Sequence, residues 1–121
     1  MVLERLGEID AAIGHYLKAL SIDPNRRAAC FALGRLLYER GRVRDAISVL
    51  QDGFRRHGTI DPAMLLLLAD AHAEMGEFEE ARAAALQALA LVESVEGAAS
   101  KEAITARLEH FERGEVYPKR Q

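Results

Sequence analysis

Three glycines divide most of the chain into segments of nearly equal length. Gly7, Gly41 and Gly76 are 34 and 35 residues apart, and similar residues follow each of them. An apolar residue comes two positions later and an alanine five positions later. The matching residues are Ile9, Val43 and Phe78, then Ala12, Ala46 and Ala81. Self-similarity at such a period indicates a repeat architecture, in which each unit buries its apolar face against its neighbours.

The segments on either side of the glycines have helical periodicity. Apolar residues recur at intervals of three and four before the second and third glycines, as expected for one face of an α-helix. The two stretches read Cys30-x-x-Leu33-Gly34-x-x-Leu37 and Leu65-x-x-Leu68-Ala69-x-x-His72. Each full repeat is therefore predicted to be a helix, a glycine turn and a second helix.

The composition supports an all-α chain. Tryptophan is absent, only three prolines occur, and alanine, leucine, glutamate and arginine are abundant, all of which are good helix formers. We predict helices over residues 8–21, 26–39, 43–57, 62–75, 77–94 and 100–113. We expect Asn25 and Asp61 to serve as N-caps, with Pro62 at the first helical position of the helix after Asp61.

The repeat pattern resembles that of the tetratricopeptide repeat family over residues 1–94. The matching residues are Ala12, Tyr16 and Pro24, then Leu33, Gly34 and Ala46, then Leu68, Ala69 and Ala81. Leu37 and His72 stand where tyrosine is usual in the family, and Gly58 and Glu93 where proline is usual. The resemblance implies an α-solenoid, a right-handed superhelix of antiparallel helix-turn-helix repeats, with a C-terminal capping helix.

The same register gives the expected organisation of the chain. We predict a partial repeat over residues 1–25, full repeats over 26–60 and 61–94, a linker and capping helix over 95–113, and a disordered tail over 114–121. Ile104, Leu108 and Phe111 recur at i, i+4 and i+7 in the capping helix and predict one buried face.

The charge distribution argues against nucleic acid as a partner. Residues 1–60 hold ten Lys or Arg and seven Asp or Glu, whereas residues 61–121 hold six and twelve, so the formal net charge is −3. Phosphate neutralisation requires a general basic excess, which this chain lacks. The first residues carry charges where a signal peptide is apolar, and no run approaches the length of a membrane span. We expect a cytoplasmic protein that does not enter membranes.

No residue pattern predicts an enzyme, a metal site or a cofactor. Cys30 is the single cysteine, so it cannot form an internal disulfide, and it shares the inward stripe of its helix with Leu33. Asp70, His72 and Glu74 resemble a ligand set, but His72 lies two residues from each carboxylate and faces elsewhere on a helix. The expected catalytic, cofactor and metal residues are therefore none.

The family resemblance implies a concave groove lined by the first helix of each hairpin. In this sequence the expected peptide-binding residues are Phe31, Arg35, Tyr38, Leu66, Leu67 and Asp70. Relatives that hold the acidic tails of heat-shock chaperones use Lys, Arg and Asn from these helices, whereas only Arg35 is basic here. We therefore expect an apolar groove that binds a peptide or helix of another protein.

A second surface is predicted at the N-terminal end. Ile9, Ile13 and Tyr16 form one broad apolar face, and we expect it to bind a second copy or another protein. The function predicted from the sequence is that of an interaction scaffold. The alternative is a structural or self-associating piece of a longer repeat array, appended in one version to an enzyme.

Overall fold

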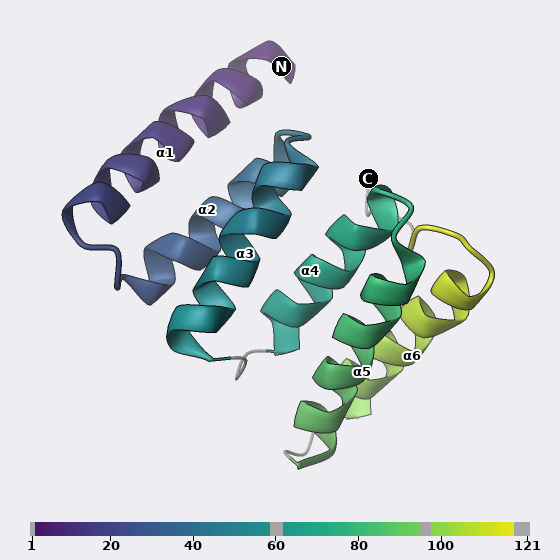
Figure 1. The fold of residues 1–121 in the computed structure, drawn as a ribbon. Helices are drawn as coiled ribbons and strands as arrows, with labels where there is room; N and C mark the ends of the chain where they lie inside the picture. Colours follow the sequence, from purple (N-terminus) through teal and green to yellow (C-terminus); the bar gives the residue numbers. More distant parts are fainter. Residues whose placement is uncertain (1, 59–61, 95–97, 118–121) are drawn as a thin grey trace. The chain divides into compact units, whose positions relative to one another are not determined.

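The computed structural model describes residues 2–58, 62–94 and 98–117, and these residues form six α-helices without a strand (Figure 1). The helices are α1 (Val2–Ile22), α2 (Arg27–Glu39), α3 (Val43–His57), α4 (Pro62–Glu74), α5 (Phe78–Ser94) and α6 (Ala98–Glu112). The predicted all-α helical-repeat fold is confirmed. The handedness of the superhelix stays a prediction.

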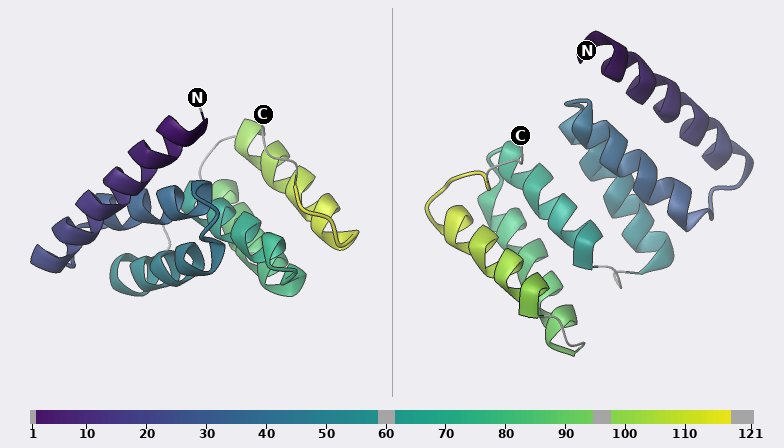
Figure 2. Two further views of the ribbon diagram at one scale, coloured as in Figure 1. Left: turned by 90° about the horizontal axis from the view of Figure 1, so that it is seen from above. Right: turned by 180° about the vertical axis from the view of Figure 1, so that it is seen from behind.

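The chain divides into two compact units, residues 1–58 and residues 59–121. In unit 1 the central helix α2 contacts both α1 and α3, and in unit 2 the central helix α5 contacts both α4 and α6 (Figure 2). Each unit therefore buries apolar residues between three helices.

The core of unit 1 lies between α1, α2 and the start of α3. Ile9 and Ile13 of α1 pack with Leu33 and Leu37 of α2 and with Ala46 of α3, and all five are buried. The two α1 residues are four apart, so they lie on one face of the helix. Exposed ion pairs between α1 and the end of α2, such as Arg40 to Asp10 at 2.8 Å, add little to this packing.

Small side chains bring the helices of unit 2 close together. The buried face of α5 consists largely of alanines, namely Ala81, Ala84, Ala85 and Ala88. Leu65 and Ala69 of α4 are buried with them. On α6, Ile104 and Phe111 are 0% and 2% exposed, whereas Leu108, the third residue of the predicted apolar face, is half-buried.

Two of the repeat glycines form matching helix-ending turns. Gly41 and Gly76 have φ angles of 89° and 76°, a region that side-chain-bearing residues rarely adopt. In each turn the next residue donates its backbone N–H to a helix carbonyl, Arg42 to Leu37 and Glu77 to His72, at 2.9 Å. This geometry satisfies carbonyls that a helix end leaves without an intrahelical partner.

Two local predictions at the N-terminal end are wrong. The first helix does not begin at residue 8 after Gly7, because α1 begins at Val2 and continues through this glycine. The preceding Leu-Glu-Arg-Leu segment consists of good helix formers, which offset the roughly 1 kcal/mol that an interior glycine costs. Asn25 is not the N-cap of α2. Its N–H binds the Asp23 carboxylate in a tight turn, and Arg26 takes the cap position without a side-chain hydrogen bond.

Gly34 is a point of close approach between α2 and α3. A Cβ atom placed on Gly34 would lie 2.7 Å from Cδ2 of Leu50, a side chain that is fully buried on α3. That separation is shorter than real side chains allow. A larger residue at position 34 must therefore displace the Leu50 side chain or push α3 away from α2.

We predict that Gly34→Leu lowers the free energy of unfolding by about 1 to 3 kcal/mol, because the extra carbons overpack the hairpin. Urea denaturation followed by circular dichroism measures the change. A transition identical to that of the wild type would contradict the close approach of α2 and α3.

Gly14→Ala is the matched control for this substitution. Gly14 lies inside α1, and nothing comes within 4 Å of a Cβ atom placed there. Alanine should raise the free energy of unfolding by about 0.5 to 1 kcal/mol, because it is the better helix former. Opposite signs at the two glycines distinguish steric overpacking from a general effect of helix propensity.

Candidate functional site

The predicted groove residues of α2 differ in accessibility. Phe31 is 8% exposed, and its ring packs against Phe54 of α3 with the centroids 5.7 Å apart. The guanidinium of Arg27 also lies over this ring, 5.7 Å from its centroid. Arg35, by contrast, is exposed. Phe31 thus contributes to the packing of unit 1, and Arg35 is the more accessible of the two to a ligand.

Tyr38 and the residues of the predicted N-terminal interface belong to the core of unit 1 or pack against it. Ile9 and Ile13 are only 7% and 4% exposed, because they pack against α2. Tyr16 and Tyr38 are half-buried and pack against the same cluster. The face of α1 that was predicted to bind a partner is therefore occupied largely within unit 1. An interface through Ile9, Ile13 and Tyr16 stays a prediction.

In unit 2, Arg107 of α6 forms an ion pair with Asp70, a predicted groove residue of α4. Leu66, Leu67 and Asp70 of α4 are half-buried. Arg107 Nε donates to Asp70 Oδ1 at 3.1 Å, and Arg107 Nη2 donates to Asp70 Oδ2 at 3.2 Å. This two-point contact holds the guanidinium and carboxylate in a fixed geometry. A partner that approaches Asp70 must therefore accommodate Arg107 as well.

Aromatic packing also holds Arg107 in place. Its guanidinium lies 4.4 Å from the centroid of the Tyr117 ring, and that ring meets His110 edge-on at 5.4 Å. Tyr117 belongs to the segment predicted to be a disordered tail, of which residues 118–121 lie outside the described part. Sequence periodicity did not predict these contacts, because Asp70 is 37 residues from Arg107 and Tyr117 lies beyond the end of α6.

We predict that Arg107→Ala lowers the free energy of unfolding by about 1 to 3 kcal/mol, since it removes the charge-assisted hydrogen bonds that Arg107 donates to Asp70 in a half-buried site. Urea titration monitored by circular dichroism measures the effect. Arg113→Ala is the control. It removes an exposed contact to Glu115 and should leave stability nearly unchanged. Equal effects of the two substitutions would show that the contact with Asp70 is not structural.

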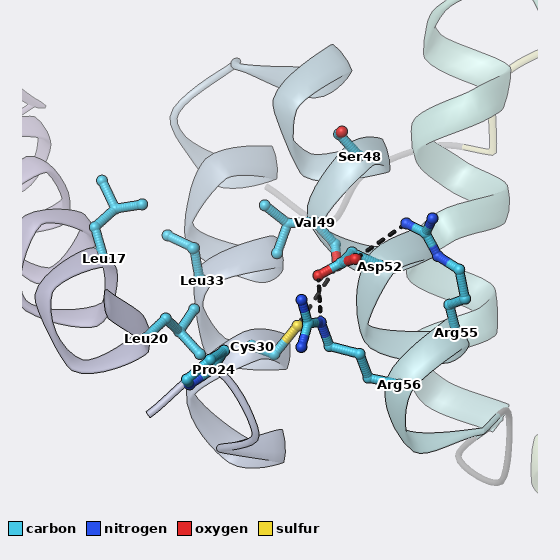
Figure 3. A pocket seen from close by; sticks show the side chains of 10 residues that line it. All are labelled: Leu17, Leu20, Pro24, Cys30, Leu33, Ser48, Val49, Asp52, Arg55 and Arg56. Atoms are coloured by element: carbon cyan, nitrogen blue, oxygen red, sulfur yellow. Dashed lines mark hydrogen bonds and ion pairs between the residues drawn. The ribbon is translucent and has the colours of Figure 1, made fainter. Parts of the chain in front are cut away.

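A pocket of about 380 Å³ lies in unit 1 between α1 and α3 (Figure 3). Leu17 and Leu20 come from α1, whereas Val49 and Asp52 come from α3. The remaining lining residues are Pro24, Cys30, Leu33, Ser48, Arg55 and Arg56. Asp52 accepts hydrogen bonds from both Arg55 and Arg56 at 3.0 Å. The pocket therefore combines an apolar wall with an ionic end, and sequence periodicity did not predict it.

Cys30 lines this pocket, but its thiol is shielded from solvent. Cys30 is 5% exposed, and its Sγ donates a 3.5 Å hydrogen bond to the Val49 carbonyl oxygen. Burial raises the pKa of the Cys30 thiol, and the negative charge of Asp52 raises the pKa further, whereas Arg56 lowers it. Both causes of the upward shift favour the unreactive neutral thiol.

We predict that iodoacetamide alkylates Cys30 at least about tenfold more slowly in the folded chain than in urea, because burial and a raised pKa both reduce accessible thiolate. Mass spectrometry of samples quenched over time gives both rates. Free cysteine in the same two solutions corrects for the effect of urea on the reagent. Equal corrected rates would contradict a buried thiol at this position.

The residues considered as metal ligands have other contacts. His72 is 7% exposed, and its Nδ1 lies 3.0 Å from Glu77 Oε1. Asp70 binds Arg107, and Glu74 is exposed. Among the residues described, no group of three or more His, Cys, Asp or Glu is arranged to hold a metal ion. In the same ranges, no helix combines the length and apolar character needed to cross a membrane.

Comparison with known families yields two matches. A family model described as tetratricopeptide repeat matches residues 31–100, which is more than half of the chain. A second model with the same description matches residues 1–26. No curated protein matches the chain. The matched ranges extend over most of unit 1 and over α4 and α5 of unit 2, and they include the positions predicted for the groove.

Proposed function

The chain belongs to the tetratricopeptide repeat family, and from this premise we propose that it is a scaffold that binds a peptide or helical segment of another protein. Repeats of this family are generally protein-protein interaction modules and generally non-catalytic. A cytoplasmic location is part of the proposal. The match over residues 31–100 is the observation that carries it.

The proposed ligand-binding residues lie on the first helix of each full repeat. Arg35 on α2 is exposed, and Leu66 and Leu67 on α4 are half-buried, so each retains surface for a ligand. Large apolar side chains and arginines often dominate binding energy where an interface excludes water. In this proposal Leu66 and Leu67 contact apolar side chains of the ligand, and Arg35 orients an acidic group.

Phe31, Tyr38 and Asp70 have secondary roles in this proposal because they are already engaged. Phe31 packs on Phe54, Tyr38 packs on the core of unit 1, and Asp70 binds Arg107. Truncation of such residues would alter the fold and the site together. Arg35 and Leu66 are therefore the more informative positions for testing the groove.

We predict that Arg35→Glu and Leu66→Asp, each introduced in the full chain, reduce recovery of bound proteins at least about fivefold, since each removes one ligand contact. Affinity capture from native lysate with quantitative mass spectrometry measures the recovery. Circular dichroism checks that each variant is folded before capture.

Two exposed residues of α5 provide matched controls. Arg82→Glu makes the same charge reversal, and Leu86→Asp makes the same change of polarity, on a second helix of a repeat. Both controls should recover the same partners as the wild type. The groove is not the binding site if the α2 and α4 variants also recover those partners in unchanged amounts.

The alternative function is that of a structural or self-associating part of a longer repeat array. Exposed apolar residues of α1 favour it, because Leu17 and Ile22 are 52% and 77% exposed. A neighbouring repeat or a second copy would cover such a surface. Multi-angle light scattering of the purified chain distinguishes self-association from peptide binding.

A further inference from the structure

The pocket between α1 and α3 is a different surface from the family groove. Its wall comes mainly from the second helices of the hairpins, whereas the proposed groove uses α2 and α4. Leu17 lines the pocket while remaining 52% exposed, so a large apolar side chain is available there to a ligand. The volume of about 380 Å³ is near the lower limit of ligand pockets and suits one or two bulky side chains.

Basic residues gather at the end of unit 1 where this pocket lies. The antiparallel order of the helices brings together the C-terminal ends of α1 and α3 and the N-terminal end of α2 (Figure 1). Among the described residues of unit 1, this end carries Lys18, Arg26, Arg27, Arg55 and Arg56, but only Asp23 and Asp52 as acidic residues. Its formal charge is therefore +3.

The remainder of unit 1 is electrically balanced. It holds five basic residues, Arg5, Arg35, Arg40, Arg42 and Arg44, and five acidic residues, Glu4, Glu8, Asp10, Glu39 and Asp45. The whole positive excess of the unit thus lies at this end, where Arg55 and Arg56 line the pocket. Two helices end and one begins there, so the partial negative charges of two C-termini are partly offset by the partial positive charge of one N-terminus. The formal charges of the side chains therefore dominate the local potential.

The two pocket arginines retain capacity to bind a further anion. Arg55 directs Nη2 and Arg56 directs Nε to the single carboxylate of Asp52 (Figure 3). A guanidinium carries five N–H donors, so both can also bind a second carboxylate. One acidic group between two arginines leaves a surplus positive charge at this end of the pocket.

We propose that this pocket binds an acidic segment of a partner protein, with a bulky apolar side chain seated against Leu17, Leu20 and Val49 and a carboxylate held by Arg55 and Arg56. The apolar contact provides most of the affinity, because water is excluded along the leucine wall. The charges select acidic over neutral or basic segments and accelerate association. The site operates whether or not the groove on α2 and α4 also binds a ligand.

A random-peptide display selection against the full chain tests this proposal. We expect enriched peptides that combine a large apolar residue with neighbouring aspartates or glutamates. Their synthetic, fluorescently labelled forms should bind at least about tenfold more weakly to Leu17→Asp, because a charge replaces the apolar wall. Double replacement by Arg55→Gln and Arg56→Gln should weaken binding about threefold to tenfold and reduce its dependence on salt.

Matched controls use the same substitutions outside the pocket. Leu86 on α5 is 49% exposed, close to the value for Leu17, so Leu86→Asp should leave binding unchanged. Arg42 pairs with Asp45 at the opposite end of α3, so Arg42→Gln controls for the loss of an exposed ion pair on the same helix. Circular dichroism melting confirms that the Leu17 and arginine variants are folded.

Each remaining outcome overturns the proposal in a recognisable way. Enriched peptides that bind Leu17→Asp normally but lose affinity for Leu66→Asp would assign binding to the groove and leave the proposed function intact. Enrichment without acidic residues, or no enrichment, would reject an acidic segment as the ligand. A dimer in light scattering that Leu17→Asp converts to a monomer would identify a second copy as the occupant instead.

Discussion

The close approach of paired helices at small residues is the constraint on which the rest of the fold depends. Gly34 leaves space for Leu50, and Ala46, Ala69 and Ala81 have no exposed surface. Helices that pack this closely exclude water along their whole contact, and the large side chains on either side then fill the core. The surfaces that remain accessible to a partner are those that this helix packing leaves uncovered.

The same packing explains which parts of the fold the sequence predicts well. Residue period and small-residue spacing placed α3 at its observed bounds, and they placed most other helices within two residues. Both signals are local, so they appear in any single stretch of sequence. Gly7 shows the limit, because its spacing matches Gly41 while its neighbours continue a helix. A glycine permits a turn, but the flanking residues determine whether one forms.

Contacts between distant residues account for what the sequence did not predict about the candidate sites. Periodicity put Phe31 and Arg35 on one helix surface, but it carried no information on Phe54, which buries Phe31. The family resemblance assigned Asp70 to a groove without reference to Arg107, 37 residues later. A helical pattern specifies the direction of a side chain, whereas its accessibility depends on which element packs there. Burial therefore divides the predicted groove into accessible and engaged residues.

Charge gives the clearest case of a property that only the fold reveals. Along the sequence, Lys18, Arg26 and Arg56 are separated by acidic residues, and the first half of the chain has only a modest basic excess. Antiparallel helices bring every second chain reversal to the same end of a unit, so charges from residues 18–27 and 52–57 become neighbours. An exposed apolar pocket lies at that end. A hairpin repeat can therefore build a chemically distinct surface from residues that no local motif connects, and such a surface need not coincide with the groove that defines its family.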